Sequence, residues 1–473
     1  MPVRPVAFVP VCFSLVEVPM TMHWNQLLSR SRLGSDQSQG GTTARTDFQR
    51  DFDRIVFSSA FRRMQDKTQV FPLSRVDYIR TRLTHSLEAS SIGRSLGTQV
   101  GERVIERRRL ADYEASDFGD ICAAACLAHD IGNPPFGHSG EDAFRSWAND
   151  APYGQRRVSM LKDSEREDFT SFEGNAQGFR ILTRLQNPDN PGGLQLTCAT
   201  LAAFTKYPRE SCLGGGRYPG VSAKKQGFFV EDRESFESVA EQVGLIRRDG
   251  SRAVWCRHPL AFLVEAADDI SYRVIDIEDG FRLGYFTFDE VMALYLDILQ
   301  EPERQRLRMQ SIRDSKGRVE FLRAKVINEA ISQAMDCFLD NEEAILAGRF
   351  DEPLLNQFPR RAAMDRLIEV AKARIYQATE VVEIQAAGFQ VIGDLLERFI
   401  QVLDDLADQG EQASAKSRMI SRLIPEQFIG PGRIPSSSVY TRLLRLTDFV
   451  AGMTDSYAVS LYKKLTGISL PNA

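Results

Sequence analysis

The sequence has no large excess of charge of either sign. Its 59 lysines and arginines stand against 64 aspartates and glutamates, which gives a formal net charge of -5 over 473 residues. This balance argues against a dedicated nucleic-acid coat protein, although a local basic groove stays possible. We interpret the densest basic run, Arg107–Arg109, as a solvated helix face. With 43% hydrophobic residues, the chain can bury a large core in one domain or in two closely packed ones.

Paired cysteine motifs are also missing. The seven cysteines are odd in number and scattered, without a CxxC pair. This usage is typical of a reduced, cytoplasmic protein. Cys122 and Cys126 lie one helical turn apart in an apolar stretch, and we expect both to be packing residues.

Long uninterrupted apolar runs are absent as well. Residues 1–20 are apolar, but Pro5, Pro10 and Pro19 interrupt them, and no cleavage-site pattern follows. We predict that residues 1–21 are a disordered tail. The alternative is that the start codon has been assigned too early and that these residues are not translated. No segment has the length and apolarity of a membrane span, so we expect a cytoplasmic protein without a membrane partner.

Phosphate-binding loops and clear strands are lacking too. The sequence contains neither GxxxxGK[ST] nor GxGxxG after a strand, so any phosphate must be held by a metal ion and by lysine or arginine side chains. Gly227–Val230 and Ala253–Trp255 are the best strand candidates, and any β element should be small and peripheral. The rest of the pattern is helical.

The C-terminal part of the chain is expected to be a helical scaffold. No proline occurs between Pro359 and Pro425, and Ile368–Leu406 has the periodicity of two long amphipathic helices. We predict that these helices form a structural scaffold or the interface of a homo-oligomer.

The most informative feature that is present is the run Leu127–Glu141. It contains the adjacent pair His129-Asp130, then a Gly/Pro break, then His138 and Glu141. Two of only 5 histidines therefore lie within this short run. The layout is typical of a metal site beside a proton-transfer pair.

Further metal ligands have to come from elsewhere in the chain. His85 lies on the preceding predicted helix, and Asp268 and Asp269 lie in an apolar stretch where unpaired acids would be costly. His85, His129, Asp130 and one of these two aspartates would suit Mn2+, Mg2+, Fe2+, Co2+ or Ni2+. The alternative is a set of separate salt-bridged acids and locally satisfied histidines.

The motifs resemble a known family. His85, His129-Asp130 and Asp268 reproduce the H...HD...D signature of the all-helical HD-domain phosphohydrolases. Five longer segments, in the same order, resemble the deoxyguanosinetriphosphate triphosphohydrolase (dGTPase) family: Arg45–Ile55, Arg80–Ser86, the HDIGNPPFGHSGE run, Phe172–Gly178 and Glu265–Tyr272. The similarity extends to about Asp455 and narrows the fourth ligand to Asp268.

The resemblance implies a reaction. Water attacks the α phosphorus of a deoxynucleoside triphosphate, foremost dGTP, and releases the deoxynucleoside and tripolyphosphate. His138 and Glu141 are spaced i and i+3, so they share a helix face, and the carboxylate can orient the imidazole as acid or base. Asn133 stands where other HD-domain chains often carry another histidine, which makes a second metal ion less expected.

The resemblance also assigns substrate-binding residues. Lys206, Lys225 and Arg442 would bind the phosphates. Lys224 is the alternative to Lys225, and Arg445 is the alternative to Arg442. Asn175 would lie near the phosphates or the attacking water. Tyr272 and Asp276 would close on the sugar and read its 3′-hydroxyl, and Gln69 would read the base.

We therefore expect an all-α HD-domain fold with additional C-terminal helices. The predicted parts are a tail (1–21), an N-terminal helical segment (22–79), the HD domain (80–280) and a C-terminal helical region (281–473). Two alternatives remain: another HD-domain nucleotide phosphohydrolase, and a nucleotide-sensing or single-stranded-DNA-binding protein on the same fold. An effector dNTP is a possible further partner.

Overall fold

The protein is built from helices. The computed structural model describes residues 21–35, 44–70, 79–212, 218–250 and 252–469, of which the tail predicted for residues 1–21 shares only Thr21. The model is 69% helical with 21 α-helices and no sheet among the described residues, so the all-α prediction is confirmed. The two strand candidates contribute only isolated bridges, among them Glu210 with Phe228 and Arg209 with Val254.

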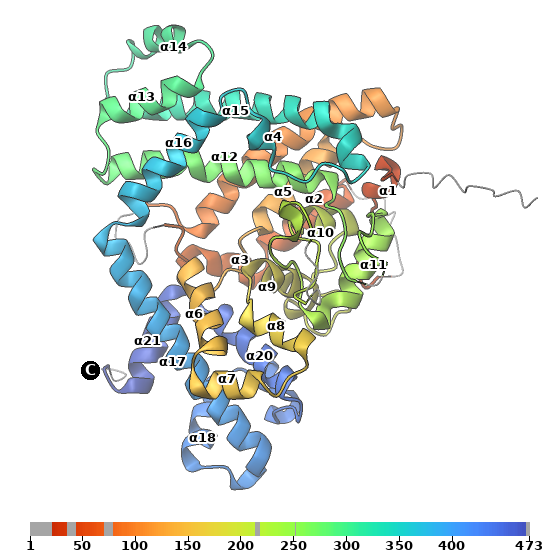
Figure 1. Ribbon diagram of the computed structural model, residues 1–473, viewed down its shortest axis with the longest axis vertical. Coiled ribbons are helices and arrows are strands. Elements are labelled where there is room, and N and C mark those ends of the chain that lie inside the picture. The colour runs from red at the N-terminus through yellow and green to blue at the C-terminus, as the bar shows by residue number, and fades with distance from the viewer. Residues whose placement is uncertain (1–20, 36–43, 71–78, 213–217, 251, 470–473) are drawn as a thin grey trace, which may run out of the picture.

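The α-helices are arranged as Figure 1 shows, and their bounds are as follows. They are α1 (Trp24–Leu27), α2 (Asp47–Val56), α3 (Ser59–Arg63), α4 (Arg82–Arg108), α5 (Ala115–Ala128), α6 (His138–Asn149), α7 (Pro152–Val158), α8 (Asp163–Thr170), α9 (Gly174–Arg180), α10 (Cys198–Phe204), α11 (Arg233–Val243), α12 (Pro259–Arg282), α13 (Phe288–Ile298), α14 (Pro302–Met309), α15 (Ser315–Leu346), α16 (Arg361–Ala371), α17 (Thr379–Gln409), α18 (Ala415–Ile420), α19 (Glu426–Ile429), α20 (Val439–Ala451) and α21 (Asp455–Thr466). Shorter helical turns include η1 (Met64–Asp66) and the π-helical turns η2 (Ile181–Leu185) and η6 (Lys372–Tyr376).

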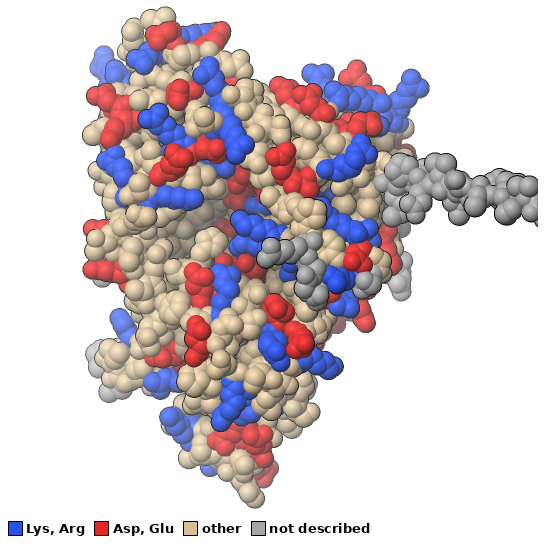
Figure 2. Space-filling model, in the orientation of Figure 1, with Lys and Arg blue, Asp and Glu red and all other residues tan. Residues whose placement is uncertain are grey.

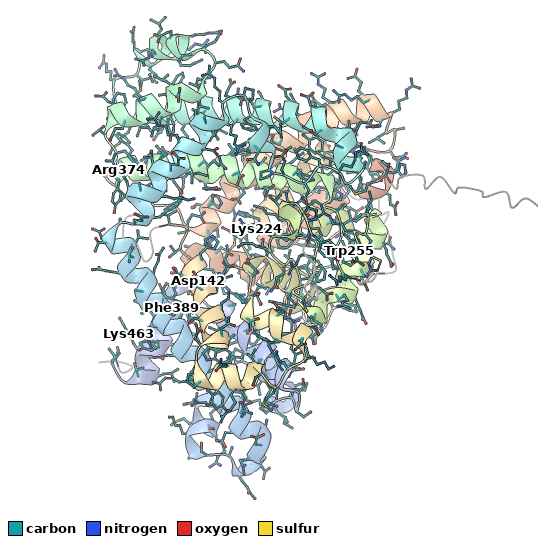
Figure 3. The ribbon with its side chains drawn as sticks, in the orientation of Figure 1. Asp142, Lys224, Trp255, Arg374, Phe389 and Lys463 are labelled. Atoms are coloured by element: carbon teal, nitrogen blue, oxygen red, sulfur yellow. The ribbon has the colours of Figure 1, made fainter. Side chains whose placement is uncertain are left out.

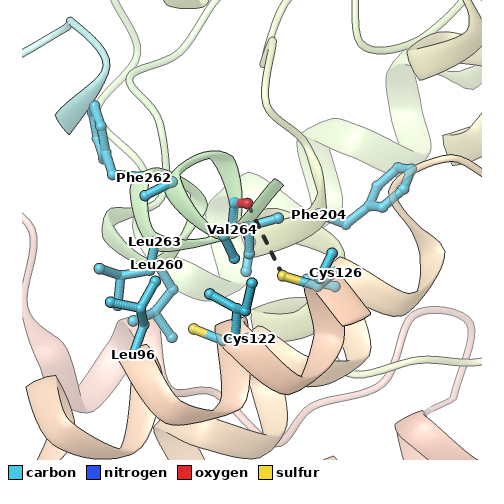
Figure 4. Packing of buried hydrophobic residues seen from close by; sticks show 14 of the residues in the cluster. Leu96, Cys122, Cys126, Phe204, Leu260, Phe262, Leu263 and Val264 are labelled. Carbon is cyan, nitrogen blue, oxygen red and sulfur yellow. Dashed lines mark hydrogen bonds between the residues drawn. The ribbon is translucent and has the colours of Figure 1, made fainter. Parts of the chain in front are cut away.

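The first hydrophobic core surrounds α5. Twelve of its 14 residues are buried, because α4, α2, α10 and α12 cover it from several sides. α4 approaches closely at Gly97, where a Cβ atom would lie 2.5 Å from the carbonyl oxygen of Phe118. Cys122 and Cys126 are buried in this core, and Figure 4 shows them facing α12, which confirms the packing prediction.

The second hydrophobic core joins α6 to the C-terminal helices. Its buried residues come from α6 to α8, α17 and α18 to α21, and they include Phe144, Trp147, Phe399 and Phe449. α6 packs along α17, and α17 in turn contacts α20 and α21. In Figure 1 these helices form the lower part of the molecule.

The predicted pair of long helices within Ile368–Leu406 is wrong, because this stretch contains the end of the shorter α16 and most of one long helix, α17. The two helices are separated by the π-helical turn η6. On its outer side α17 exposes Val382 and Phe389, the second of which is labelled in Figure 3.

The surface carries charge of both signs. In Figure 2 lysines and arginines are interspersed with aspartates and glutamates over the visible face. Within the part of the chain that the structure describes, no helix combines the length and apolarity needed to cross a bilayer.

Candidate metal centre and acid/base pair

Three of the predicted ligands converge at one point in the first core. His85 lies in the first turn of α4, His129 follows the last residue of α5, and Asp268 lies midway along α12. Their ligand atoms all lie within 4.8 Å of one another. Asp268 Oδ1 is 3.2 Å from His85 Nε2 and 3.4 Å from His129 Nε2. Three helices that pack on one another thus bring two imidazoles and a carboxylate together.

The local folding of α5 fixes how His129 is presented. Its Nδ1 lies 2.6 Å from the backbone carbonyl oxygen of Cys126, which also accepts a longer hydrogen bond, at 3.4 Å, from the His129 backbone N–H at the end of the helix. Nδ1 therefore carries the proton and donates it, and Nε2 faces the other two ligands as a lone-pair donor. His85 is oriented in a similar way, with Nδ1 3.5 Å from Ser271 Oγ.

The electrostatics of the cluster favour a positive charge. Burial raises the pKa of Asp268, but the imidazoles of His129 and His85 outweigh it and hold that pKa well below its usual value. Burial lowers the pKa of His129, whereas the carboxylates of Asp130 and Asp268 raise it, to about 9 overall. The site thus binds a proton more tightly than an isolated histidine does, and a divalent cation can take the place of that proton. The donor set fits such a cation.

Asp130 lies at the edge of this cluster. Its Oδ2 accepts a hydrogen bond from Arg82 Nη1 at 2.6 Å and lies 3.6 Å from His129 Nε2. Its other oxygen accepts from the Asn133 side chain. The converging group therefore contains three of the four predicted ligands, and coordination by Asp130 stays a prediction. Sequence reasoning had not identified Arg82 as its partner.

The second predicted element, His138 with Glu141, is formed on α6. His138 Nδ1 lies 2.8 Å from Glu141 Oε2, and the other oxygen of Glu141 accepts from the Gly174 backbone N–H at 2.7 Å. Burial raises the pKa of Glu141, but the hydrogen bond and charge of His138 outweigh it, so the carboxyl stays ionised. The His138 side chain is 80% exposed, which leaves its Nε2 accessible.

Two of the predicted phosphate-binding lysines lie beside buried acids. Lys225 Nζ is 2.9 Å from Glu173 Oε2 and also close enough to Glu141 for the two charges to interact. Lys206 Nζ is 3.3 Å from Glu265 Oε1 and interacts electrostatically with Asp268. The first lysine thus lies next to the acid/base pair and the second next to the metal ligands.

The predicted sugar-binding residues are joined by a residue that sequence reasoning missed. Asp276 lies two turns after Asp268 on α12, and its carboxylate accepts a hydrogen bond from the Tyr376 hydroxyl. Burial raises the pKa of Asp276 to about 7. Tyr272 is half-buried on the same helix and interacts electrostatically with Tyr376. No local pattern marks Tyr376, because it ends the π-helical turn η6.

The remaining predicted substrate-binding residues do not belong to the converging group of ligands. Gln69 is half-buried, and its Oε1 is shielded from solvent without a hydrogen-bond partner. Asn175 is half-buried in the first turn of α9. Arg442 is buried in the second core, where it pairs with Asp404 Oδ1 at 2.9 Å and donates to two backbone carbonyls. Its alternative, Arg445, donates to the carbonyl oxygen of Ile429. The structure therefore does not bring Arg442 into the metal cluster.

Comparisons with known proteins identify the family. The HD domain family model matches residues 82–186, which include His85, His129, Asp130, His138 and Glu141. A deoxyguanosinetriphosphate triphosphohydrolase-like protein of Synechocystis is 47% identical over 459 residues, which cover 95% of this chain and 100% of the relative. Proteins with the same description are 40% identical in Pseudomonas aeruginosa (strain LESB58) and 35% identical in Listeria innocua, each over 95% of this chain and 100% of the relative. The chain therefore belongs to the deoxyguanosinetriphosphate triphosphohydrolase-like family and contains an HD domain.

Proposed function

We propose that this protein hydrolyses deoxynucleoside triphosphates, with dGTP as the leading substrate, to a deoxynucleoside and tripolyphosphate. Water adds to the α phosphorus, the bond from that phosphorus to the 5′-oxygen breaks, and the 5′-oxygen takes up a proton. The activity would control the deoxynucleotide pool in the cytoplasm. The names of the full-length relatives support this reaction class.

The observation that carries the proposal is the convergence of His85, His129 and Asp268, with an acid/base pair on the adjoining helix. A metal cluster alone would fit many HD-domain hydrolases. The paired imidazole and carboxylate of His138 and Glu141, reached from His129 through one short loop, add the proton transfer that phosphate-ester cleavage needs.

A divalent ion, Mg2+ or Mn2+ and alternatively Co2+, Ni2+ or Fe2+, would be held by His85, His129 and Asp268, with Asp130 as the predicted fourth ligand. When bound, the ion supplies Lewis-acid polarisation of a phosphate oxygen and lowers the pKa of a coordinated water. The tautomer imposed by the Cys126 carbonyl leaves His129 Nε2 ready for this role.

His138 would transfer the proton. Because Glu141 accepts from Nδ1–H, the exposed Nε2 is the atom that takes a proton from water or gives one to the departing 5′-oxygen. The ionised Glu141 stabilises the imidazolium that forms during this step. Gly174 N–H holds the carboxylate in place from the other side.

The remaining residues would bind the substrate. A triphosphate carries roughly four negative charges at neutral pH, so Lys206 and Lys225 would neutralise part of the charge, with Asn175 nearby. Arg442 could join them only if its bond to Asp404 were exchanged. Tyr272 would exclude a 2′-hydroxyl and Asp276 would accept from the 3′-hydroxyl. Gln69 would read the base edge with its Oε1, which has no hydrogen-bond partner but would first have to become exposed.

The assembly and further partners belong to the same proposal. Val382 and Phe389 on the outer side of α17 support a homo-oligomer formed through the C-terminal helices. An effector dNTP and single-stranded DNA are proposed as further ligands, which the substrate mixtures and a salt-dependent DNA-binding assay would detect.

The test is to incubate the protein with Mn2+ or Mg2+ and each of the four dNTPs, alone and mixed, and to separate the products by anion exchange. His129→Ala/Asp130→Ala is the inactive variant. His23→Ala is the matched control, since His23 is exposed and makes no side-chain cap hydrogen bond. The proposal is supported if the wild type and His23→Ala release deoxynucleoside and tripolyphosphate and the inactive variant does not. Orthophosphate, pyrophosphate or no turnover in any mixture would overturn it.

A further inference from the structure

The turn that leads into His138 has an unusual backbone. Phe136 has φ +62°, a left-handed conformation that bulky side chains rarely adopt, and Gly137 follows with φ +60°. The Phe136 ring is buried against α17, where a Cβ atom on Gly388 would lie 2.4 Å from its Cγ atom. Because α6 begins at the next residue, the dihedral angles of this turn determine where His138 points. Such a conformation persists only where the surrounding structure enforces it.

Asp455 supplies an interaction that can enforce it. This aspartate is the first residue of α21 and is 1% exposed. Its Oδ1 accepts a hydrogen bond from the Phe136 backbone N–H at 3.0 Å. Its Oδ2 accepts from the Thr68 backbone N–H at 2.9 Å and from the Thr68 hydroxyl. One buried carboxylate therefore connects the C-terminal helix to the turn before His138 and to the residue before Gln69.

A second buried group holds the middle of the same loop. Lys67 is 3% exposed, and its Nζ donates to the carbonyl oxygens of Asn133 and Ala451 at 2.5 Å and 2.9 Å. Ala451 ends α20, a few residues before Asp455. The loop between His129 and His138 is thus attached near its middle, at Asn133, and near its end, at Phe136, to the junction of α20 and α21.

The position of this loop matters because it connects the two cores. The metal ligands lie on helices of the first core, whereas α6 packs on α17 in the second, as the neighbouring α6 and α17 in Figure 1 illustrate. The covalent link between the metal cluster and the acid/base pair is the loop itself. Its conformation therefore sets the distance from His138 to the metal ligands.

We infer that Asp455 is a positioning residue that holds the Phe136–Gly137 turn in its left-handed conformation and so directs His138 toward the metal cluster. The effect on kcat that we expect from this inference rests on the proposed function. Through Thr68, the same carboxylate also fixes the segment that carries Gln69. The C-terminal helix α21 then contributes to the active site through Asp455.

The test compares Asp455→Asn with Asp455→Ala. Asparagine keeps the size of the side chain but cannot accept from both backbone N–H groups, because one of its terminal atoms is itself a donor. We expect kcat to fall about tenfold in Asp455→Asn and further in Asp455→Ala, whereas Mn2+ affinity, measured by calorimetry, stays within about twofold of wild type. Ser456→Ala is the matched control. Ser456 lies next to Asp455 on α21, but its hydroxyl donates to Asp66, so the substitution leaves the contacts of the Phe136–Gly137 turn unchanged.

A readout that does not depend on turnover accompanies the kinetics. The chain has only 5 histidines, so the His138 signal can be assigned in a 13C/15N-histidine-labelled sample with a His138→Asn reference. The His138 resonance should move in both Asp455 variants, while the His258 resonance stays in place and reports an intact fold. An unchanged His138 signal, an unchanged kcat, or a loss of Mn2+ affinity parallel to the loss of kcat would overturn the inference. If the wild type does not hydrolyse dNTPs, the proposed function fails, and the His138 resonance still decides whether Asp455 positions that side chain.

Discussion

The carbonyl oxygen of Cys126 accepts a hydrogen bond from Nδ1 of His129 at 2.6 Å, three residues further along the chain. This bond fixes the tautomer of a metal-ligand candidate through a carbonyl in the last turn of α5, which also accepts a longer bond, at 3.4 Å, from the His129 backbone N–H. The apolar helix that carries Cys126 thus determines which nitrogen of His129 faces Asp268. The core and the site are therefore built by the same helix end.

Removal of one ligand should abolish tight metal binding. Loss of groups that merely orient metal ligands commonly lowers affinity by about 10- to 100-fold, so loss of a direct ligand should cost about 100-fold or more. We expect this for His129→Ala and Asp268→Ala in Mn2+ titrations monitored by calorimetry, with dNTP hydrolysis lost in parallel. His23→Ala should bind Mn2+ like the wild type. Unchanged Mn2+ affinity in Asp268→Ala would show that the cluster is not the metal site.

Substitution of the acid/base pair should affect turnover and spare metal binding. His138→Asn and Glu141→Gln should each lower kcat by about 100- to 10,000-fold, the usual contribution of a positioned proton-transfer group. Mn2+ affinity should stay unchanged, because neither side chain belongs to the converging ligand group. Asp142→Asn, on the exposed side of α6, is the control and should retain full activity. A double variant that loses much more than either single variant would contradict the view that the two residues act as one unit.

The metal-ligand candidates could largely be predicted from the sequence. The charged residues that surround them could not. The rarity of histidine and the acids in an apolar helix selected His85, His129 and either Asp268 or Asp269, and the family resemblance then selected Asp268, which the structure brings to the two histidines. The orientation of Asp130 depends on Arg82, which reaches it only because α4 packs against α5. Periodicity predicts that both helices exist, but it does not predict which charged side chains meet across their interface.

The residues that sequence reasoning missed are brought to the site by tertiary packing alone. Tyr376 and Asp276 are 100 positions apart, and Asp455 and Phe136 are 319 apart. The π-helical turn that ends at Tyr376 shifts the helical phase, which a regular apolar pattern does not reveal. For Arg442 the resemblance suggested a phosphate contact, but the structure gives it a buried partner in Asp404.

Asp276 should control recognition of the 3′-hydroxyl. If its carboxylate accepts a hydrogen bond from the sugar, Asp276→Ala should reduce the kcat/KM preference for dGTP over 2′,3′-dideoxy-GTP by about 10- to 100-fold. Tyr376→Phe should reduce the same preference less, because it removes only the hydroxyl that holds the carboxylate. Asp289→Ala, an exposed position at the start of α13, serves as the control. An unchanged preference in Asp276→Ala would place the sugar elsewhere.

His258 should make the stability of the protein depend on pH. This histidine is fully buried, its Nδ1 accepts from the Leu260 N–H at the start of α12, and its Nε2 lies 3.0 Å from the carbonyl oxygen of Leu27. Burial lowers its pKa to about 4, and the bond to Leu27 only partly opposes that effect. The folded protein therefore holds the neutral ring at pH values where the unfolded chain has already bound a proton.

The sign of the effect follows from this difference in proton binding. Between about pH 6.5 and pH 4 the unfolded chain binds more protons at this position, so the free energy of unfolding falls as the pH falls through that window. The loss should approach about 3 kcal/mol, an order-of-magnitude value for a histidine that titrates near pH 4 when folded and near pH 6.5 when unfolded. His258→Asn keeps a side-chain acceptor at the helix start and removes the titration. Urea unfolding at pH 7.0 and pH 4.5 should therefore show a smaller difference for the variant than for the wild type, and equal differences would mean that His258 is protonated in the folded state.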